Sequence, residues 1–266
     1  MKIKTVLFCV FLGNAVAAQT NEAVFAQIQK LPVSPTKAET ALQIAQHFLG
    51  SPYAAHTLEQ TSENLVPNLT QFDCYTFVES IVALTLTRHQ AGNYAVYQQF
   101  LRQLRYRSGR INGYGSRLHY FLEWAQQAQA NGLLRDVSQE LGGVAIQKKI
   151  DFMSAHQMHY SAFAEGQSQI VEAERKLSQS QWFYVPKIQV AAVVNQLQNG
   201  DIVAFTSAKT GLDFNHEGFV VIKNKRAHLL HASTDHQKVL ISSETLLVYL
   251  QRIKSHSGLL ILRLRD

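Results

Sequence analysis

The sequence predicts an α+β fold, in which N-terminal helices pack on a C-terminal antiparallel sheet. Segments with helical spacing of apolar residues come first, and from Asn199 onwards they give way to short β-rich runs separated by turns. Helices followed by strands, rather than alternating with them, are typical of α+β proteins. Hydrophobic residues make up 46% of the chain and charged residues 17%, so the chain can bury a core of ordinary globular size.

Residues 1–18 have the layout of a cleavable secretory signal. Two lysines precede a short apolar run, which ends in an alanine-rich stretch. We expect cleavage after Ala17 or Ala18, which would leave residues 19–266 as the mature protein. The apolar run is too short to span a bilayer, so no transmembrane segment is expected. The protein is predicted to be exported, to the periplasm.

The charge of the mature chain points to an anionic partner. Removing the two lysines of the signal would leave 23 basic against 19 acidic residues and a net charge of +4. Such a charge suits an anionic partner such as a cell-wall polymer. No basic run is interleaved with aromatic residues, so nucleic acid is not a predicted partner. A monomer is the default expectation for the oligomeric state.

Two helices are predicted at the start of the mature chain, over 20–31 and 37–49. The second begins after a Ser-Pro-Thr sequence and carries apolar residues along one face, and Gly50 ends it. An irregular stretch rich in Ser, Thr, Asn and Pro then runs up to the next helix.

The third helix carries a cysteine at its start. Asp73 has a short acceptor side chain suited to capping a helix, and apolar residues dominate 77–86 with no Gly or Pro. Cys74 then lies in the first turn, where the positive end of the helix favours a thiolate. Because Cys9 would leave with the signal, Cys74 would remain unpaired in an oxidising compartment, where an unused thiol is a liability. A buried structural cysteine is the alternative.

Further helices are predicted at 93–107 and 117–130, separated by a loop that contains three glycines. The stretch 150–185 has no dominant pattern. The core is favoured over a lid for its large apolar residues, which are Met153, Met158, Tyr160 and Phe163. We expect a single domain over 19–266 with a helical insertion at about 92–185.

The C-terminal part predicts an antiparallel sheet on which the cysteine helix would pack. Turns such as Asn199-Gly200 and Asn224-Lys225 separate the strands, and a peripheral helix is expected at 243–251. The predicted strands are 201–205, 218–222, 227–231, 239–241 and 259–264.

Two histidines of the sheet region are placed to serve the cysteine. His216 stands directly ahead of one predicted strand, and His231 stands at the end of the next. A hairpin through Asn224-Lys225 would bring them together, because antiparallel partners equidistant from a turn face each other. A cysteine nucleophile needs a base, and the base needs a polar partner that fixes its tautomer. We therefore predict that His216 faces the thiol of Cys74 and that His231 lies behind His216.

Other chemistries have weaker support. Cys74, His216 and His231 are also possible metal ligands, but the chain has no H-E-x-x-H, no C-x-x-C and no close-spaced ligand pair on one helix. A serine hydrolase is not predicted, because the chain has no G-x-S-x-G elbow.

Several motifs, taken in order along the chain, resemble a known family. The first set resembles the NlpC-type papain-like cell-wall hydrolases: Gly50-Ser51-Pro52-Tyr53, Phe72-Asp73-Cys74, His216-Glu217-Gly218-Phe219-Val220 and Leu230-His231-Ala232-Ser233. The second set is similar to the N-acetylmuramoyl-L-alanine amidase-like branch: Ala55-His56-Thr57-Leu58-Glu59, Cys74-Tyr75-Thr76-Phe77-Val78-Glu79, Ser116-Arg117-Leu118-His119-Tyr120-Phe121, Gly200-Asp201-Ile202-Val203, Gly211-Leu212-Asp213 and residues 258–263. The resemblance spans roughly residues 45–264.

The resemblance implies a papain-like NlpC-type fold with a Cys-His-His site and neither metal nor cofactor. It implies that Cys74 is the nucleophile, that His216 is the general base and acid, and that His231 orients His216. The hydroxyl of Tyr53 and the backbone N–H of Cys74 would stabilise an oxyanion.

Further residues are candidates for contacts with the substrate. Arg117, with Tyr114 and His119, would meet the carboxylates and the sugar of a muropeptide, although Arg117 also fits a surface cation at a helix start. Asp73 is favoured as a helix cap over a proton donor.

Two glutamates need separate comment. Glu217 replaces the small aliphatic residue that many relatives have after the strand-opening histidine, and it would either raise the pKa of His216 or turn to solvent. Glu79 is expected in a structural hydrogen-bond network.

The predicted function is hydrolysis of the amide between N-acetylmuramic acid and L-alanine, in peptidoglycan or muropeptides, through a thioester on Cys74. Cleavage between D-glutamate and diaminopimelate by the same fold is the first alternative. A non-catalytic wall-binding protein and an acyltransferase that uses the same thioester are the others.

Overall fold

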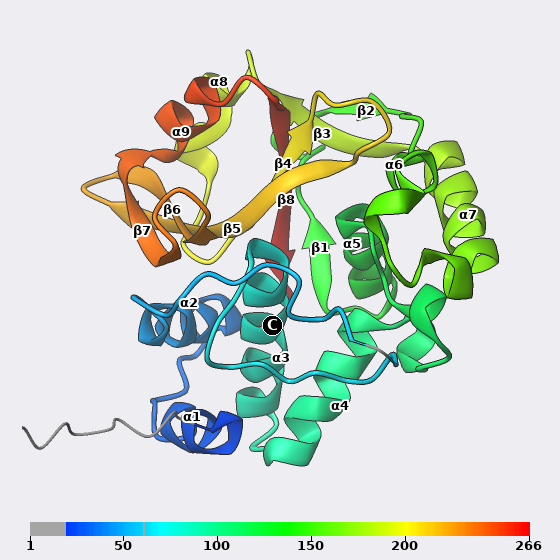
Figure 1. The fold of residues 1–266 in the computed structure, drawn as a ribbon. Coiled ribbons are helices and arrows are strands. Elements are labelled where there is room, and N and C mark those ends of the chain that lie inside the picture. Colours follow the sequence, from blue (N-terminus) through cyan, green and yellow to red (C-terminus); the bar gives the residue numbers. More distant parts are fainter. Residues whose placement is uncertain (1–19, 61) are drawn as a thin grey trace, which may run out of the picture.

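The computed structural model describes residues 20–60 and 62–266 (Figure 1). The predicted secretory signal at 1–18 lies outside these residues. Among the helices that are described, none has the length and apolar character needed to cross a membrane. Helices pack on an eight-stranded antiparallel sheet, which confirms the α+β prediction.

Four helices form the N-terminal part: α1 (Asn21–Ile28), α2 (Lys37–His47), α3 (Cys74–His89) and α4 (Tyr94–Arg105). Each begins after a Thr, Asp or Asn whose side chain accepts the N–H of the third helical residue. Residues 76–87 of α3 are all buried, since α2, α4 and the sheet surround it. The predicted helices are confirmed here, with slightly shorter bounds.

The sheet combines the five predicted strands with three that were not predicted. The predicted strands are β4 (Ile202–Ser207), β5 (Phe214–Lys223), β6 (Arg226–Ser233), β7 (Lys238–Thr245) and β8 (His256–Leu264). The additional strands are β1 (Leu134–Asp136), β2 (Val144–Ile146) and β3 (Trp182–Pro186). The order is β2-β3-β8-β4-β5-β6-β7, with β1 paired to β8. The segment predicted as a helical insertion therefore also contributes strands to the sheet.

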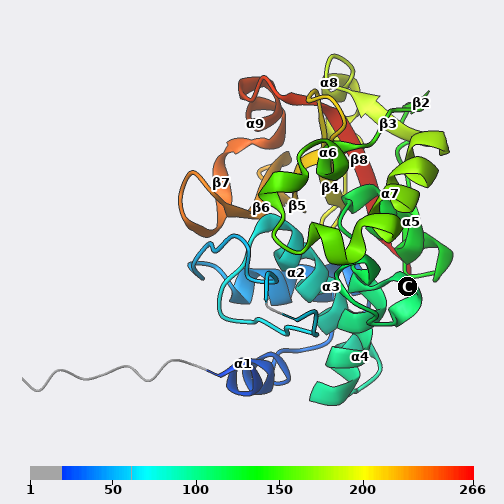
Figure 2. The ribbon, with the colours of Figure 1, turned by 45° about the vertical axis from the view of Figure 1, so that its right-hand side comes forward.

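The sheet separates two apolar cores (Figures 1 and 2). On one face, Phe219 of β5 packs edge-on against Phe77 of α3, with 6.0 Å between ring centroids. On the other face, Val220 belongs to a core covered by α8 (Val190–Val193) and α9 (Leu246–Arg252). Successive residues of β5 thus alternate between the two cores.

The middle of the chain contains α5 (Phe121–Ala130), α6 (Phe152–Ala155) and α7 (Phe163–Gln179), with the short 3-10 turns η1 (Arg107–Gly109), η2 (Tyr114–Ser116), η3 (Gln157–His159) and η4 (Val194–Gln196). The helix predicted over 117–130 starts late, because Arg117 is extended and pairs with Tyr106 in a β-bridge. Met153 and Phe163 are buried as predicted, and Tyr160 is partly buried. Met158 is 93% exposed, so the core prediction is wrong there.

A buried ion pair joins α3 to α4. Glu79 accepts two hydrogen bonds from the Arg105 guanidinium, at 2.6 and 2.8 Å, and Arg105 also donates to the carbonyl of Val66. Both charged side chains are at most 1% exposed. The prediction that Glu79 belongs to a structural network is confirmed.

We expect Glu79→Ala to lower the free energy of unfolding by about 3–5 kcal/mol, because it leaves the Arg105 charge buried without a partner. Urea unfolding followed by circular dichroism measures this. Glu172→Ala, which removes the exposed partner of Arg175, is the control and should change stability little. A loss for Glu79→Ala as small as that of the control would contradict a structural role for the pair.

Candidate active site

Cys74 is the first residue of α3, and Asp73 caps the helix. The Asp73 carboxylate accepts hydrogen bonds from the backbone N–H and the hydroxyl of Thr76, both at 2.7 Å, and the Thr76 hydroxyl accepts the Asp73 N–H at 3.1 Å. This capping box satisfies the third N–H of the helix and leaves the N–H groups of Cys74 and Tyr75 pointing out of its start. The predicted cap is confirmed.

The thiol of Cys74 is neutral in the resting site. Burial raises its pKa well above the ordinary value, the carboxyls of Glu217 and Asp73 raise it further, and the backbone N–H of Glu217 lowers it. Burial and the two acids oppose the helix dipole, which by itself favours the predicted thiolate. Attack by this thiol requires a base.

The hairpin between β5 and β6 has the predicted turn. Asn224 and Lys225 adopt φ values of 49° and 61°, as a tight hairpin turn requires. The ladder between the two strands runs from this turn to the pair Phe219–Leu230 and ends there, while β6 continues against β7. The edge of β5 at Glu217 is thereby left open, and its N–H points at the thiol.

The structure places the two predicted histidines side by side, with His216 inside β5 rather than ahead of it. Nε2 of His216 lies 2.6 Å from Nδ1 of His231, and the rings are nearly perpendicular at 85°. Burial lowers the pKa of both histidines, that of His231 to about 4, so both are neutral at neutral pH. The Nδ1 atom of His216 takes no part in this contact and is free to accept a proton.

The Glu217 side chain is hydrogen-bonded to the thiol of Cys74. It is 4% exposed and shares the α3 face of β5 with Phe219. Both predictions for Glu217 are wrong, since it neither turns to solvent nor raises the pKa of His216. The reason is the period of the strand, which sends neighbouring side chains to opposite faces.

The thiol nevertheless lies close to the histidine face of the sheet. Tyr249 of α9 packs on both histidine rings, with centroids 6.0 Å from that of His216 and 5.4 Å from that of His231. Burial and nearby charges, including that of Cys74, raise the pKa of Tyr249. Cys74 thus acts electrostatically on Tyr249, which packs on the two histidines, as well as on Glu217.

Tyr53 is held beside the cysteine by backbone pairing. It forms a parallel bridge with Phe72, and the flanking Ala54 N–H donates to the Phe72 carbonyl at 2.9 Å. Burial, followed by the charges of Cys74, Asp73 and Glu217, raises the pKa of Tyr53 to about 12. Its hydroxyl keeps its proton at neutral pH and can donate it to an oxyanion.

A cavity of about 220 Å³ opens beside the start of α3. The lining residues come from α3, from the loop before it and from the segment after η2, and they are Asp73, Tyr75, Thr76, His56, Leu58, Glu59, Arg117, Leu118 and His119. The Tyr75 hydroxyl donates to the carbonyl of Leu118 at 2.9 Å, which fixes one wall. Three predicted substrate-binding residues, Asp73, Arg117 and His119, thus line one cavity.

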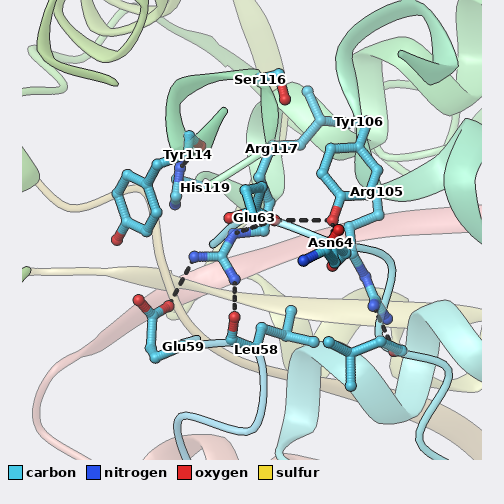
Figure 3. Close-up of polar contacts among 12 residues, drawn as sticks. Leu58, Glu59, Glu63, Asn64, Arg105, Tyr106, Tyr114, Ser116, Arg117 and His119 are labelled. Atoms are coloured by element: carbon cyan, nitrogen blue, oxygen red, sulfur yellow. Dashed lines mark hydrogen bonds and ion pairs between the residues drawn. The ribbon is translucent and has the colours of Figure 1, made fainter. Parts of the chain in front are cut away.

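Arg117 is committed to the loop that forms the outer wall (Figure 3). Its guanidinium donates to the carbonyl of Leu58 at 3.0 Å and to Glu59 at 2.7 Å, and its Nε lies 3.8 Å from Glu63. The side chain is 4% exposed. Arg117 is therefore neither the predicted surface cation nor a free ligand for a substrate carboxylate.

His119 and Tyr114 support this arrangement (Figure 3). His119 Nε2 lies 2.9 Å from the Tyr114 carbonyl, and because a carbonyl only accepts, Nε2 carries the hydrogen and Nδ1 is an acceptor. Burial and the nearby Arg117 charge lower the pKa of His119 to about 3, so the ring is neutral. The Tyr114 ring lies under the guanidinium of Arg117, at 4.9 Å, instead of lining the cavity.

Comparison with known proteins identifies the family to which this fold belongs. A family model for N-acetylmuramoyl-L-alanine amidase-like proteins matches residues 43–259. The chain belongs to this family. It is similar to the solved structure of an N-acetylmuramoyl-L-alanine amidase from Bacteroides uniformis ATCC 8492, with a TM-score of 0.82 and 33% sequence identity over 86% of this chain and 99% of that chain.

Two further solved structures extend the comparison. A Bacteroides fragilis protein described as a candidate xylanase has a TM-score of 0.79 and 34% identity, over 83% of this chain and 98% of that chain. A Legionella pneumophila protein shares the fold, with a TM-score of 0.68 at 19% identity, over 92% of this chain and 93% of that chain. No curated protein sequence matches the chain.

Four residues at the site of this amidase-like chain were not among the predicted site residues: Glu59, Glu217, Tyr249 and His256. Glu59 lies in one of the motifs that carry the family resemblance, and Glu217 departs from the small aliphatic residue that many relatives have there. Both could therefore have been found from the sequence. Tyr249 and His256 pack around the histidines from α9 and β8, and the His256 ring stacks on Phe205 at 4.6 Å. No local pattern marks these two, because their role depends on tertiary packing.

We expect Arg117→Ala to release the loop of this family's cavity. It removes two charge-assisted hydrogen bonds, each contributing about 1.5–3 kcal/mol, so amide hydrogen exchange in residues 56–60 should become at least roughly tenfold faster. Hydrogen exchange read by mass spectrometry measures this. Arg110→Ala, at an exposed arginine of the same region, is the control. Unchanged exchange with weaker substrate binding would instead identify Arg117 as a free substrate ligand.

Proposed function

We propose that this protein is an exported, periplasmic cysteine amidase with a papain-like NlpC-type site. It hydrolyses the amide between the lactyl group of N-acetylmuramic acid and L-alanine, in peptidoglycan or its soluble fragments. The observation that carries the proposal is Cys74 at the start of a buried helix that packs on β5 and β6, the strands that bear the paired His216 and His231. Membership of the amidase-like family supports the class of reaction.

In this proposal His216 is the general base and acid. For its Nδ1 to accept the thiol proton, its Nε2 must carry the other hydrogen and donate it to Nδ1 of His231. Once protonated, His216 is an imidazolium, and the hydrogen bond to His231 stabilises it. His231 thereby fixes both the tautomer and the orientation of the base.

Acylation follows from attack of the Cys74 sulfur on the carbonyl carbon of the muramyl lactyl group. His216 returns its proton to the amide nitrogen, the C–N bond breaks, and the peptide leaves with a free L-alanine amine. The N–H of Cys74 and the hydroxyl of Tyr53 stabilise the oxyanion of the tetrahedral intermediate. The muramyl group remains as a thioester on Cys74.

Deacylation uses the same groups in reverse. His216 takes a proton from water, and the resulting hydroxide attacks the thioester carbon. The muramyl group leaves as a carboxylic acid, and the Cys74 thiolate takes the proton back from His216.

The cavity beside α3 suits a ligand rich in hydrogen-bond donors. Acceptor atoms of Asp73, Glu59 and Nδ1 of His119 line it, and the two terminal nitrogens of Arg117 already donate to Leu58 and Glu59. We place the sugar there, because its hydroxyls and acetamido N–H match those acceptors. The acidic peptide then extends away from this cavity.

The acceptor-rich cavity also supports one alternative. In an endopeptidase acting between D-glutamate and diaminopimelate, the free ammonium of L-alanine would take the place of the sugar. The two reactions use the same nucleophile and base, and they differ in which donor group fills the cavity.

The test is incubation of mature protein with soluble muropeptides and analysis of the products by mass spectrometry. We expect a free peptide that begins with L-alanine, and no product with Cys74→Ala. A fragment that begins with diaminopimelate would establish the endopeptidase. Amine adducts in place of free acid would indicate an acyltransferase, and binding without cleavage would indicate a wall-binding protein. Cleavage of glycosidic bonds that survives Cys74→Ala would indicate a glycosidase.

We expect His216→Ala to lower kcat by about 10²–10⁴-fold, the usual contribution of a general acid–base group. His231→Ala should cost less, because the base is still present but its tautomer is no longer fixed. Steady-state kinetics on the same substrate measures both. His228→Ala, at a histidine on the far part of β6, is the control. A His231→Ala loss greater than that of His216→Ala would reverse the two assignments.

A further inference from the structure

Glu217 is a buried acid without a cation. Its side chain is 4% exposed, and within the described ranges no lysine, arginine or histidine forms an ion pair with it. The buried guanidinium groups of Arg105 and Arg117 are paired with other carboxylates. An isolated buried carboxylate is so unfavourable that such a group takes up a proton instead.

The groups that face Glu217 are acidic or neutral. They come from α3, from the segment beside it and from the residue before β5, and they are Asp73, Cys74, Tyr75, Tyr53 and Asp213. Burial raises the pKa of Glu217 to about 8, with the hydrogen bond from the Cys74 thiol opposing the rise and Asp73 and Asp213 adding to it. Burial raises the pKa of Asp213 to about 6. The histidine beside it in β5, His216, titrates far lower. Glu217 is thus the facing group that changes charge near pH 8.

The packing of α3 against β5 also brings Glu217 close to Cys74. Phe77 and Phe219 are in contact, Cys74 lies one helical turn before Phe77, and Glu217 lies two strand residues before Phe219. The two periods bring the carboxyl and the thiol onto facing surfaces of α3 and β5.

We propose that Glu217 is a further catalytic residue, which in its protonated form donates a hydrogen bond to the sulfur of Cys74 and stabilises the thiolate during attack. The proposal rests on Cys74 as the nucleophile of the proposed function. A carboxylic acid kept neutral in an apolar site is an established kind of hydrogen-bond donor in enzymes.

The proton count of the reaction is unchanged by this role. The thiol proton moves to Nδ1 of His216, and Glu217 keeps its own proton throughout. The O–H of Glu217 points at the sulfur while the sulfur carries charge, until the bond to the acyl carbon forms. When Glu217 ionises, its carboxylate repels the thiolate, and the reactivity of Cys74 falls relative to that of a free thiol.

Alkylation of Cys74 by iodoacetamide tests the proposal over the range from about pH 6 to about pH 9.5, because the rate follows the thiolate fraction. For the wild type we expect the rate to rise about tenfold per pH unit at first and to flatten above about pH 8. Glu217→Gln keeps a donor without a charge, so its rate should rise through that range without a break. Identical unbroken profiles for both proteins would overturn the proposal.

Comparison of Glu217→Val with Glu217→Gln separates the effect of the hydrogen-bond donor from the effect of the carboxylate charge. Glu217→Val removes the donor, so its alkylation at pH ~7 should be about 10–100-fold slower than that of Glu217→Gln, the loss expected for a hydrogen bond to a charged group. Equal rates for the two variants would overturn the donor role. Each variant is first checked for a cooperative unfolding transition like that of the wild type.

Glu174→Gln is the matched control, since this buried acid on α7 binds Tyr120 and lies outside the groups that act on the thiol. Its profile should keep the wild-type break, and loss of the break there would overturn the assignment to Glu217. Alkylation needs no amide substrate, so an inactive amidase assay leaves this test intact and the two proposals fail separately.

Discussion

The contact between Phe77 of α3 and Phe219 of β5 fixes where the nucleophile meets the sheet. It sets Cys74 opposite Glu217, and the ladder to β6 ends at the same residue, Phe219, so the strand edge beside the thiol is free. A shift of β5 by one residue would exchange its faces and carry His216 to the α3 side. Every distance in the site therefore depends on the register of one strand against one helix.

Buried charge holds the cavity in shape where apolar packing is sparse. Arg105 ties α4 to Glu79 and to the Val66 carbonyl, and Arg117 ties the segment after η2 to Leu58. The loop before α3 is irregular, and although Leu69 and Phe72 anchor its end in the core, its middle part around Leu58 and Glu59 is held by these charge-assisted hydrogen bonds. The two terminal nitrogens of Arg117 are thereby engaged with the loop, and the carboxylates of Asp73 and Glu59 remain among the groups that line the cavity.

The parts of the fold set by local chemistry were predictable from sequence. The turn at Asn224-Lys225 specifies the hairpin, and from it the pairing of His216 with His231 follows; Asp73 and its Thr76 partner specify the helix start. The partners of Arg117 were not predictable, because they lie about sixty residues earlier in a loop without a periodic pattern.

The short strands β1 to β3 were missed for a related reason. Each has three to five residues. β1 and β3 form by pairing with β8, and β2 forms by pairing with β3. Segments this short carry little periodicity of their own, and their strand character comes from the pairing. Glu217 illustrates the same limit, since its face depends on the register that packing selects.

The electrostatics of the site favour a neutral resting state. Burial raises the pKa of the Cys74 thiol and lowers that of His216, so a thiolate–imidazolium pair is disfavoured before substrate arrives. Thiolates are the form that oxidants attack. A neutral thiol resists oxidation, and in the proposed mechanism its proton moves to His216 when an acyl carbon is in place to take up the negative charge. The burial that makes the thiol a weak nucleophile at rest thereby ties its activation to the bound substrate.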